Sequence, residues 1–326
     1  MNGENDILSL QAFAIDGKTP LDFSPDWPDR AHQFERREAV AIQAALLSGR
    51  PLLVEGPPGS GKTQIAAAAA SVLGRELIAF VVNSNTRPED LLWQYDALQR
   101  LNDAQAKKLG LPKDYLSKGP LWLALDSGDD HSKIPAAVSP YKPRNKQASG
   151  KVVLLDEIDK ADRSVPNSLL EVLGQQRFYC PYVKKEIGLD GDAPPLIVIT
   201  SNREQQLPPA FVRRCLVLRV GLPDDEGAFV EKLSRRAQMH FDNDNGLSDH
   251  QYREVARALW KYRQNSGLAE EMQPGQAEYF DLVRAISGAL KQGLTREDGA
   301  PLSFDDLMDD MRGLAFDKRG LGDRVE

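Results

Sequence analysis

One stretch of this sequence combines the residue types that bind phosphate groups. It is the run Gly56, Pro57, Pro58, Gly59, Ser60, Gly61, Lys62 and Thr63, which fits the pattern G-x-x-x-x-G-K-[ST]. Glycines let the backbone curl so that several N–H groups point toward one anion. The Lys62 ammonium would attract the β- and γ-phosphates, and the Thr63 hydroxyl is suited to ligate Mg²⁺. The run therefore predicts a phosphate-binding loop.

Two elements must flank such a loop, and the sequence offers both. Residues 51–55 form a short apolar run that is typical of a buried strand. Residues 62–73 are rich in alanine and predict a helix that ends at Gly74. This order places the dipole of a helix N-terminus at the bound phosphates. The context argues against a glycine-rich turn that carries Lys-Thr by accident.

A pair of carboxylates ends another apolar run. Residues 152–155 are Val-Val-Leu-Leu, and Asp156 and Glu157 follow directly. Beside a phosphate loop, Asp156 would hold Mg²⁺ through water, and Glu157 would act as the general base on the attacking water. Two acids at a strand end can also form a solvated turn, but the apolar run before them favours the site. We interpret Asp159 and Asp162 as charges at a helix start.

A third strand and a short helix add polar candidates. Residues 196–200 predict a strand followed by Asn202, which either orients the water beside the γ-phosphate or occupies a tight turn. A helix within 207–215 ends in Arg213 and Arg214. Arginines at a helix C-terminus ordinarily complement its dipole. The alternative is an arginine finger that reaches the γ-phosphate of a neighbouring subunit.

Strands that alternate with helices predict an α/β fold, with a parallel sheet covered by helices on both faces. We expect an N-terminal strap over 1–30, an α/β nucleotide-binding domain over 31–222 and a helical lid domain over 223–326. The α/β domain would contain a loop-like insert at 126–151 and a β-hairpin at about 176–195.

Helical periodicity covers 31–48, and Pro88 opens an expected helix over 89–101. Ser248 with Gln251 forms a plausible capping box, and Ser303 is a plausible N-cap. In the lid domain, four helices are expected near 224–241, 248–265, 275–291 and 303–312.

Composition places the chain among ordinary folded proteins. Of the 326 residues, 41% are apolar and 27% are charged. No apolar run reaches the roughly 20 residues of a membrane span. The N-terminus lacks the basic and apolar regions of a secretory signal. Two cysteines, Cys180 and Cys215, argue against a disulfide scaffold or a cysteine zinc site, so we expect buried thiols and a cytoplasmic location.

Charge is unevenly distributed along the chain. The net charge is −7, from 41 basic and 48 acidic residues. Residues 223–326 hold 21 acidic and 14 basic groups, which leaves the first 222 residues neutral. An acidic chain does not resemble a general nucleic-acid coat. Residues 131–151 carry five basic groups and no acid, which indicates either a solvated loop or a contact for an acidic partner or a translocated polymer.

The order of these motifs resembles an AAA+ ATPase over about residues 33–290. Within that family the sequence looks most like the MoxR-type ATPases. Residues 88–92 followed by 119–121 resemble the helix-2 insert region, and 207–215 resemble the arginine segment. The expected hairpin at 176–195 lies where that group has its pre-sensor hairpin.

The resemblance assigns a role to each candidate residue. It implies a Walker A pair of Lys62 and Thr63, a Walker B pair of Asp156 and Glu157, a sensor 1 Asn202, and an arginine finger at Arg214 with Arg213 as its possible substitute. It also implies ATP and Mg²⁺, a ring that is usually a hexamer, and chaperone-like remodelling of a protein client. MoxR-type ATPases commonly work with partners that have a von Willebrand factor A domain.

One expected residue of the resemblance is missing. AAA+ proteins often carry a sensor 2 arginine early in a lid helix, but residues 273–279 contain none, and Arg284 lies further along. Besides an ATP-hydrolysing motor, a nucleotide-gated scaffold with little turnover therefore stays open. A nucleic-acid or defence-type ATPase is a third hypothesis, which the basic stretch at 131–151 motivates and the overall charge opposes.

Overall fold

The computed structural model describes most of the chain in two compact units. The first unit comprises residues 1–55 and 62–219, and the second comprises residues 56–61 and 220–326. The described residues are 10–15, 17–25, 27, 31–126, 133–144, 150–189, 194–241, 246–268, 273–296 and 298–317.

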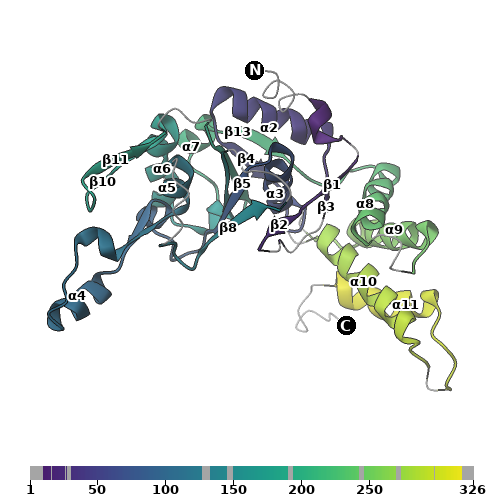
Figure 1. Cartoon of the computed structure of the whole chain (residues 1–326). Coiled ribbons are helices and arrows are strands. Elements are labelled where there is room, and N and C mark those ends of the chain that lie inside the picture. The colour runs from purple at the N-terminus through teal and green to yellow at the C-terminus, as the bar shows by residue number, and fades with distance from the viewer. Residues whose placement is uncertain are drawn as a thin grey trace. The chain divides into compact units, whose positions relative to one another are not determined.

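A seven-stranded sheet forms the centre of the first unit (Figure 1). Its strands, in spatial order, are β13 (Leu216–Arg219), β4 (Leu52–Glu55), β12 (Leu196–Ser201), β9 (Lys151–Asp156), β5 (Glu76–Val81), β8 (Val138–Pro143) and β2 (Phe23–Ser24). The first five strands pair in parallel, and β8 and β2 are antiparallel additions at one edge. The predicted α/β class with a mostly parallel sheet is therefore confirmed.

Helices cover the sheet because both of its faces are apolar. In β9, Val153 and Leu155 pack in one core cluster with Leu169 of α6. Val152 and Leu154 alternate with them, are equally buried, and point to the opposite face. The helices of this unit are α2 (Arg36–Ser48), α3 (Lys62–Leu73), α4 (Ala97–Gln105), α5 (Pro120–Leu125), α6 (Ser164–Gln175) and α7 (Pro209–Arg214).

Several short elements complete the first unit. The antiparallel pairs are β1 (Lys18–Pro20) with β3 (Ala31–Gln33), β6 (Trp93–Tyr95) with β7 (Leu116–Lys118), and β10 (Arg177–Cys180) with β11 (Lys185–Gly188). The 3-10 turns are η1 (Leu10–Phe13), η2 (Pro88–Leu91), η3 (Pro112–Tyr115) and η4 (Ile158–Lys160). The β10–β11 pair is the hairpin expected within 176–195.

The prediction of a single helix over 89–101 is wrong. That stretch contains η2, β6 and the start of α4, and α4 begins only after Asp96, whose side chain accepts the Gln99 N–H. The rings of Trp93 and Tyr95 pack against Phe178 and Tyr182 of the β10–β11 region, so tertiary packing overrides the helical pattern. The helix expected over 31–48 is also shorter, since it begins at Arg36 after β3.

The insert expected at 126–151 is not simply a solvated loop. Its residues 138–143 form β8, which pairs with β5 and covers an otherwise open sheet edge. Lys133, Arg144 and Lys151 donate to the backbone oxygens of Asp114, Phe23 and Leu123, respectively. Two parts of the insert lie outside the described residues, namely 127–132 and 145–149, and the second part includes Lys146.

Within its described residues, the second unit contains four helices around their own apolar core. Phe229, Leu259, Tyr279 and Ile286 are among its fully buried residues, and the Tyr279 hydroxyl donates to the Tyr252 carbonyl at 3.1 Å. The helices are α8 (Glu226–Phe241), α9 (Asp249–Asn265), α10 (Gln276–Gln292) and α11 (Phe304–Phe316). The capping box of Ser248 with Gln251 and the N-cap at Ser303 are both confirmed. In the parts that the structure describes, no helix has the length and apolar character needed to cross a membrane.

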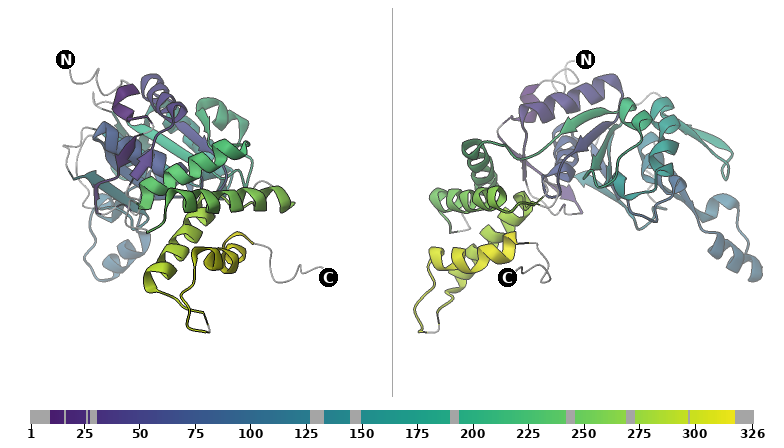
Figure 2. Two further views of the ribbon diagram at one scale, coloured as in Figure 1. Left: turned by 90° about the vertical axis from the view of Figure 1, so that its right-hand side faces the viewer. Right: turned by 180° about the vertical axis from the view of Figure 1, so that it is seen from behind.

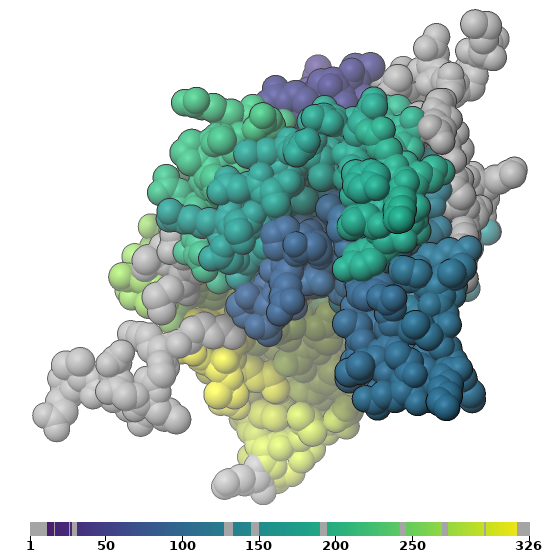
Figure 3. Space-filling view, turned by 90° about the vertical axis from the view of Figure 1, so that its left-hand side faces the viewer, coloured from purple at the N-terminus to yellow at the C-terminus, as the bar shows by residue number. Residues whose placement is uncertain are grey.

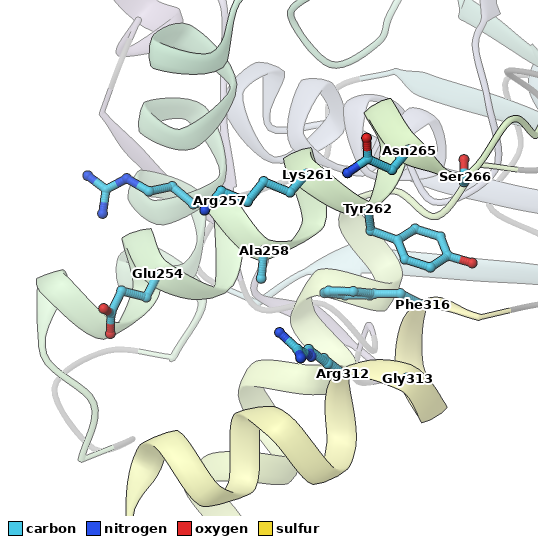
Figure 4. Close-up of a pocket in the computed structure, with 10 residues that line it drawn as sticks. All are labelled: Glu254, Arg257, Ala258, Lys261, Tyr262, Asn265, Ser266, Arg312, Gly313 and Phe316. Carbon is cyan, nitrogen blue, oxygen red and sulfur yellow. The ribbon is translucent and has the colours of Figure 1, made fainter.

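A cleft of about 580 Å³ opens between α9 and α11 of this helical unit (Figure 4). The rings of Tyr262 and Phe316 lie side by side in it, with their centroids 5.9 Å apart. The cations Arg257, Lys261 and Arg312 also line the cleft. No residue predicted for the phosphate site is among its described lining residues.

Both cysteines are free and buried, as expected for structural thiols. Burial raises the pKa of the Cys215 thiol to about 12, because an apolar environment disfavours the thiolate. Cys215 directly follows α7, and its Sγ lies 3.4 Å from the Phe211 carbonyl oxygen.

Candidate functional site

The carboxylate of Asp156 connects three elements at the C-terminal end of β9. The Thr63 hydroxyl, in the first turn of α3, lies 3.1 and 3.0 Å from its two oxygens. The Thr200 hydroxyl, near the end of β12, donates to its Oδ1 at 2.5 Å. β9 and β12 are parallel neighbours, so their carboxyl ends meet at one edge of the sheet, where α/β folds bind ligands.

Burial shapes the electrostatics of this cluster. Desolvation raises the pKa of the Asp156 carboxyl, while the hydrogen bonds from Thr200 and Thr63 lower it in part. Desolvation likewise lowers the pKa of the Lys62 ammonium, and the negative charge of Asp156 works against that effect. A buried cation beside a partly buried carboxylate and a hydroxyl forms a polar site at the start of α3.

The side chains of Glu157 and Asn202 lie in contact. The Nδ2 of Asn202 is 3.3 Å from Glu157 Oε1, and the Lys160 ammonium is 2.6 Å from Glu157 Oε2. The hydrogen bond to Glu157 raises the pKa of Lys160. Glu157 has a left-handed backbone with φ 61° and ψ 47°, and its N–H donates to the Thr200 hydroxyl at 2.8 Å.

Asp159 has a role that the sequence analysis missed. It is buried, with 1% exposure, and accepts the backbone N–H groups of Asn202 at 3.2 Å and Glu204 at 2.9 Å. It therefore fixes the loop that carries Asn202, instead of serving only as a helix-start charge. Asp162 does behave as a helix-start residue, since it accepts the Ser164 N–H at 2.8 Å. No spacing rule distinguishes these two aspartates in the sequence.

Arg50 holds the C-terminal end of α7, which carries the arginine pair. Its guanidinium donates to the carbonyl oxygens of Arg213 at 2.6 Å, Arg214 at 3.1 Å and Cys215 at 2.9 Å. A cation at these carbonyls satisfies the dipole of α7. The side chains of Arg213 and Arg214 are exposed and have no hydrogen-bond or ion-pair partner within the described residues. No described contact joins either one to Asp156 or Glu157.

The glycine loop, residues 56–61, belongs to the second compact unit. The chain continues directly from Gly61 into Lys62, the first residue of α3. Gly59 and Gly61 have φ of +69° and +89°, the left-handed region that favours glycine. A Cβ on Gly56 would lie 2.3 Å from the Val220 carbonyl oxygen, so the backbone leaves no room for one. The Ser60 hydroxyl is buried and has no partner among the described residues.

These features fit a bound triphosphate with its cation. The left-handed glycines and the orphaned Ser60 hydroxyl suit an anion that accepts hydrogen bonds. The oxygens of Thr63 and Asp156 are the hard donors that Mg²⁺ prefers. The residue types that the sequence analysis assigned to a nucleotide and its metal ion therefore have the chemistry that each requires.

The residue that faces the glycine loop from the start of α10 is Ala277. A Cβ built on Gly59 would lie 2.8 Å from the Ala277 Cβ, and one on Gly275 would lie 3.7 Å from the Pro58 carbonyl oxygen. Residues 273–279, which contain no arginine, therefore lie in close contact with the glycine loop. Arg236 of α8 donates to the side-chain oxygen of Gln276.

A mostly parallel sheet with a glycine-rich loop between β4 and α3 defines a P-loop nucleoside-triphosphatase domain. Residues 51–215 match the family model described as an AAA domain of the dynein-related subfamily. The chain belongs to this AAA family.

Among curated proteins, similarity is low and partial. A Lon protease of Rhizobium meliloti is 26% identical over 267 residues, which is 79% of this chain and 28% of the protease. A proteasome-associated ATPase of Saccharopolyspora erythraea is 26% identical over 206 residues, which is 61% of this chain and 30% of that ATPase. The matched regions therefore span less than a third of these relatives.

Among solved structures, a mutant of Thermotoga maritima RuvB is similar to this chain. It is 16% identical, with a TM-score of 0.45, and the match covers 88% of this chain and 71% of RuvB.

Replacing Thr200 by valine tests the Asp156 cluster. The variant leaves a buried carboxylate oxygen and the Glu157 N–H without their shared hydroxyl, so we expect a loss of about 1–3 kcal/mol in unfolding free energy. Urea unfolding measures this loss. Ser234→Ala is the matched control, because that buried hydroxyl bonds only to carbonyls of its own helix. A loss no larger than that of the control would contradict the proposed network.

Replacing Arg50 by methionine tests the support of α7. Without the guanidinium, the last carbonyls of α7 lose their donors, and we expect the helix end to be less stable by about 1 kcal/mol. Hydrogen exchange of the α7 amides should be faster. In the control Arg75→Met, a guanidinium that donates to the Pro194 carbonyl is lost instead, and α7 exchange should not change. Equal exchange rates in both variants would refute the role of Arg50.

Proposed function

We propose that this protein is a MoxR-like AAA+ ATPase, which hydrolyses ATP at the subunit interfaces of a ring oligomer and thereby remodels or activates a protein partner. The observation that carries the proposal is the contact of Glu157 with Asn202, directly beside the carboxylate of Asp156. A base, a water-positioning amide and a cation ligand at one sheet edge are what triphosphate hydrolysis requires.

Each residue has a distinct task in this scheme. The N–H groups of Gly59, Ser60 and Gly61 and the Lys62 ammonium bind the phosphates. Thr63 with Asp156 holds the cation. Mg²⁺, when bound, would neutralise charge that develops on the β- and γ-phosphates. Glu157 takes a proton from the attacking water, and Asn202 keeps the Glu157 carboxylate and that water in place.

The arginine pair is proposed to act on a neighbouring subunit. Arg214 is the finger and Arg213 its neighbour and possible substitute. Their exposed side chains, which have no intrachain partner in the described part, favour this role over dipole complementation, since Arg50 already serves the dipole of α7. A site shared between subunits requires oligomerisation, and we propose that the oligomer is a hexameric ring.

The wider assignments rest on the resemblance. By this resemblance, the protein has a chaperone-like role in the cytoplasm. Its client or partner is a protein with a von Willebrand factor A domain. In this proposal, β10–β11 serves as the pre-sensor hairpin and residues 93–118 as the helix-2 insert.

Two other functions compete with this proposal. Ala277, at the position facing the glycine loop, supports a nucleotide-gated scaffold that turns over slowly. A nucleic-acid motor is not favoured, because Lys133, Arg144 and Lys151 of the basic stretch bond to backbone oxygens of the chain itself. Salt-dependent binding to DNA would revive that hypothesis.

Glu157→Gln should retain ATP binding and lose hydrolysis by about 10²-fold or more, because the amide cannot accept the proton of the attacking water. Steady-state phosphate release and binding of a fluorescent ATP analogue measure the two quantities. Glu186→Gln, on the exposed edge of β11, is the matched control and should behave as the parent protein. Lys62→Ala should instead weaken binding. Normal turnover in Glu157→Gln would overturn the general-base assignment.

A mixing experiment tests action between subunits. Arg214→Ala should lower turnover by about tenfold or more while ATP binding by the isolated chain persists. Turnover per subunit of the parent protein should rise with concentration. Mixing Arg214→Ala with Glu157→Gln should restore part of the activity, since some interfaces then combine an intact base with an intact finger. Activity that is independent of concentration and never rescued would favour a site within one subunit.

A further inference from the structure

A segment between β5 and α5 carries a helix that lacks a core of its own. We define it as the arm, residues 93–118, in which β6 and β7 form the base and α4 and η3 the far end. α4 stands away from the sheet (Figures 1 and 2), and Figure 3 shows the arm as the dark blue surface. None of the nine residues of α4 is buried. Isolated helices of this length are marginal in water, so α4 needs support from elsewhere.

The far end of the arm exposes large apolar side chains. Leu98 is 69% exposed and Leu101 is 55% exposed, and their spacing of three places them on one face of α4. Leu109 and Leu111, which follow the helix, are 54% and 59% exposed. Single exposed leucines are ordinary, whereas several within one short segment indicate an interaction surface.

The carboxylates of the arm are occupied by local hydrogen bonds. Asp96 accepts the Gln99 N–H at 2.7 Å, and Asp114 accepts the Leu111 N–H at 2.8 Å. Asp103 accepts the Tyr115 hydroxyl at 2.9 Å. These bonds define the ends of α4 and η3.

The cations of the far end have no such partners. Within the described part of the chain, no side-chain hydrogen bond or ion pair is found for four of them, namely Arg100, Lys107, Lys108 and Lys113. The far end therefore presents leucines among four cationic side chains without a described partner. The three carboxylates of the segment keep their negative charge, but their oxygens accept local hydrogen bonds.

The arm is preformed by aromatic packing at its base. The rings of Tyr95 and Tyr182 are stacked at 4.0 Å, and Trp93 lies 5.5 Å from Phe178. A Cβ on Gly119 would lie 2.7 Å from three backbone atoms of residues 90–92, so the chain leaves the arm through a close backbone contact. A surface held in this way loses little conformational entropy when it binds.

We propose that the far end of the arm binds an acidic amphipathic helix of a partner protein. Leucines of that helix would cover Leu98 and Leu101, and its glutamates or aspartates would pair with the four free cations. Charge complementarity selects this occupant, since a basic or neutral helix would leave those cations unpaired or repelled. The docking needs no hydrolysis, so it can succeed or fail independently of the proposed ATPase activity.

The test uses a labelled peptide of about 18 residues, five helical turns, with leucines at spacings of three and four and glutamates between them. Fluorescence anisotropy with the full chain should show saturable binding that weakens with salt. Leu98→Ser with Leu101→Ser should weaken it by about tenfold or more. The matched control Leu314→Ser, an 83% exposed leucine of α11, should bind as the parent does.

A charge swap keeps the test independent of folding effects. Lys107→Glu with Lys108→Glu should weaken binding of the acidic peptide and gain binding of a version with lysines in place of its glutamates. Circular dichroism should be unchanged in all variants, because none of these residues is buried.

Several outcomes would overturn the proposal. One is the absence of saturation up to about 1 mM peptide, or equal weakening in Leu314→Ser. Another is sedimentation with phosphatidylglycerol vesicles that depends on Leu98 and Leu101 in the absence of peptide binding, which would assign the surface to a membrane. A third is self-association that disappears in the leucine variant, which would assign it to a second copy of the chain.

Discussion

The polar cluster at the end of β9 depends on how a partly buried carboxylate finds hydrogen-bond donors. Asp156 loses hydration at the end of β9, and the hydroxyls of Thr63 and Thr200 replace part of what it loses. Because each hydroxyl belongs to a different element, the same bonds that stabilise the charge also align α3, β9 and β12. Thr200 contributes twice, since its oxygen also receives the N–H of Glu157. The left-handed backbone of Glu157 is thereby held, and the carboxylate turns toward Asn202.

Sequence patterns predicted the elements whose signal is local. β4, β9 and β12 are continuous apolar runs because both faces of the sheet are covered, and α3 spans the predicted residues 62–73. The capping box at Ser248 needs only neighbouring residues, so it too was predictable. Asn202 and Glu157 were each predicted to follow a strand, but their contact with each other was not predicted and emerges only in the structure.

The remaining features arise from contacts between distant residues. β8 forms because the edge of β5 requires a partner, although its own sequence has little strand character. The helix expected over 89–101 gave way to β6 because Trp93 and Tyr95 pack against aromatic rings more than 80 positions away. Asp159 and Arg50 act on backbone groups of loops and helix ends, and such acceptors leave no pattern in the sequence.

The stacked rings at the base of the arm have a structural consequence. Tyr182 belongs to the turn of the β10–β11 hairpin, and that hairpin lies in the chain between α6 and β12, the strand that leads to Asn202. The two tyrosines therefore join the arm to a hairpin whose chain continues into β12, the strand that precedes Asn202.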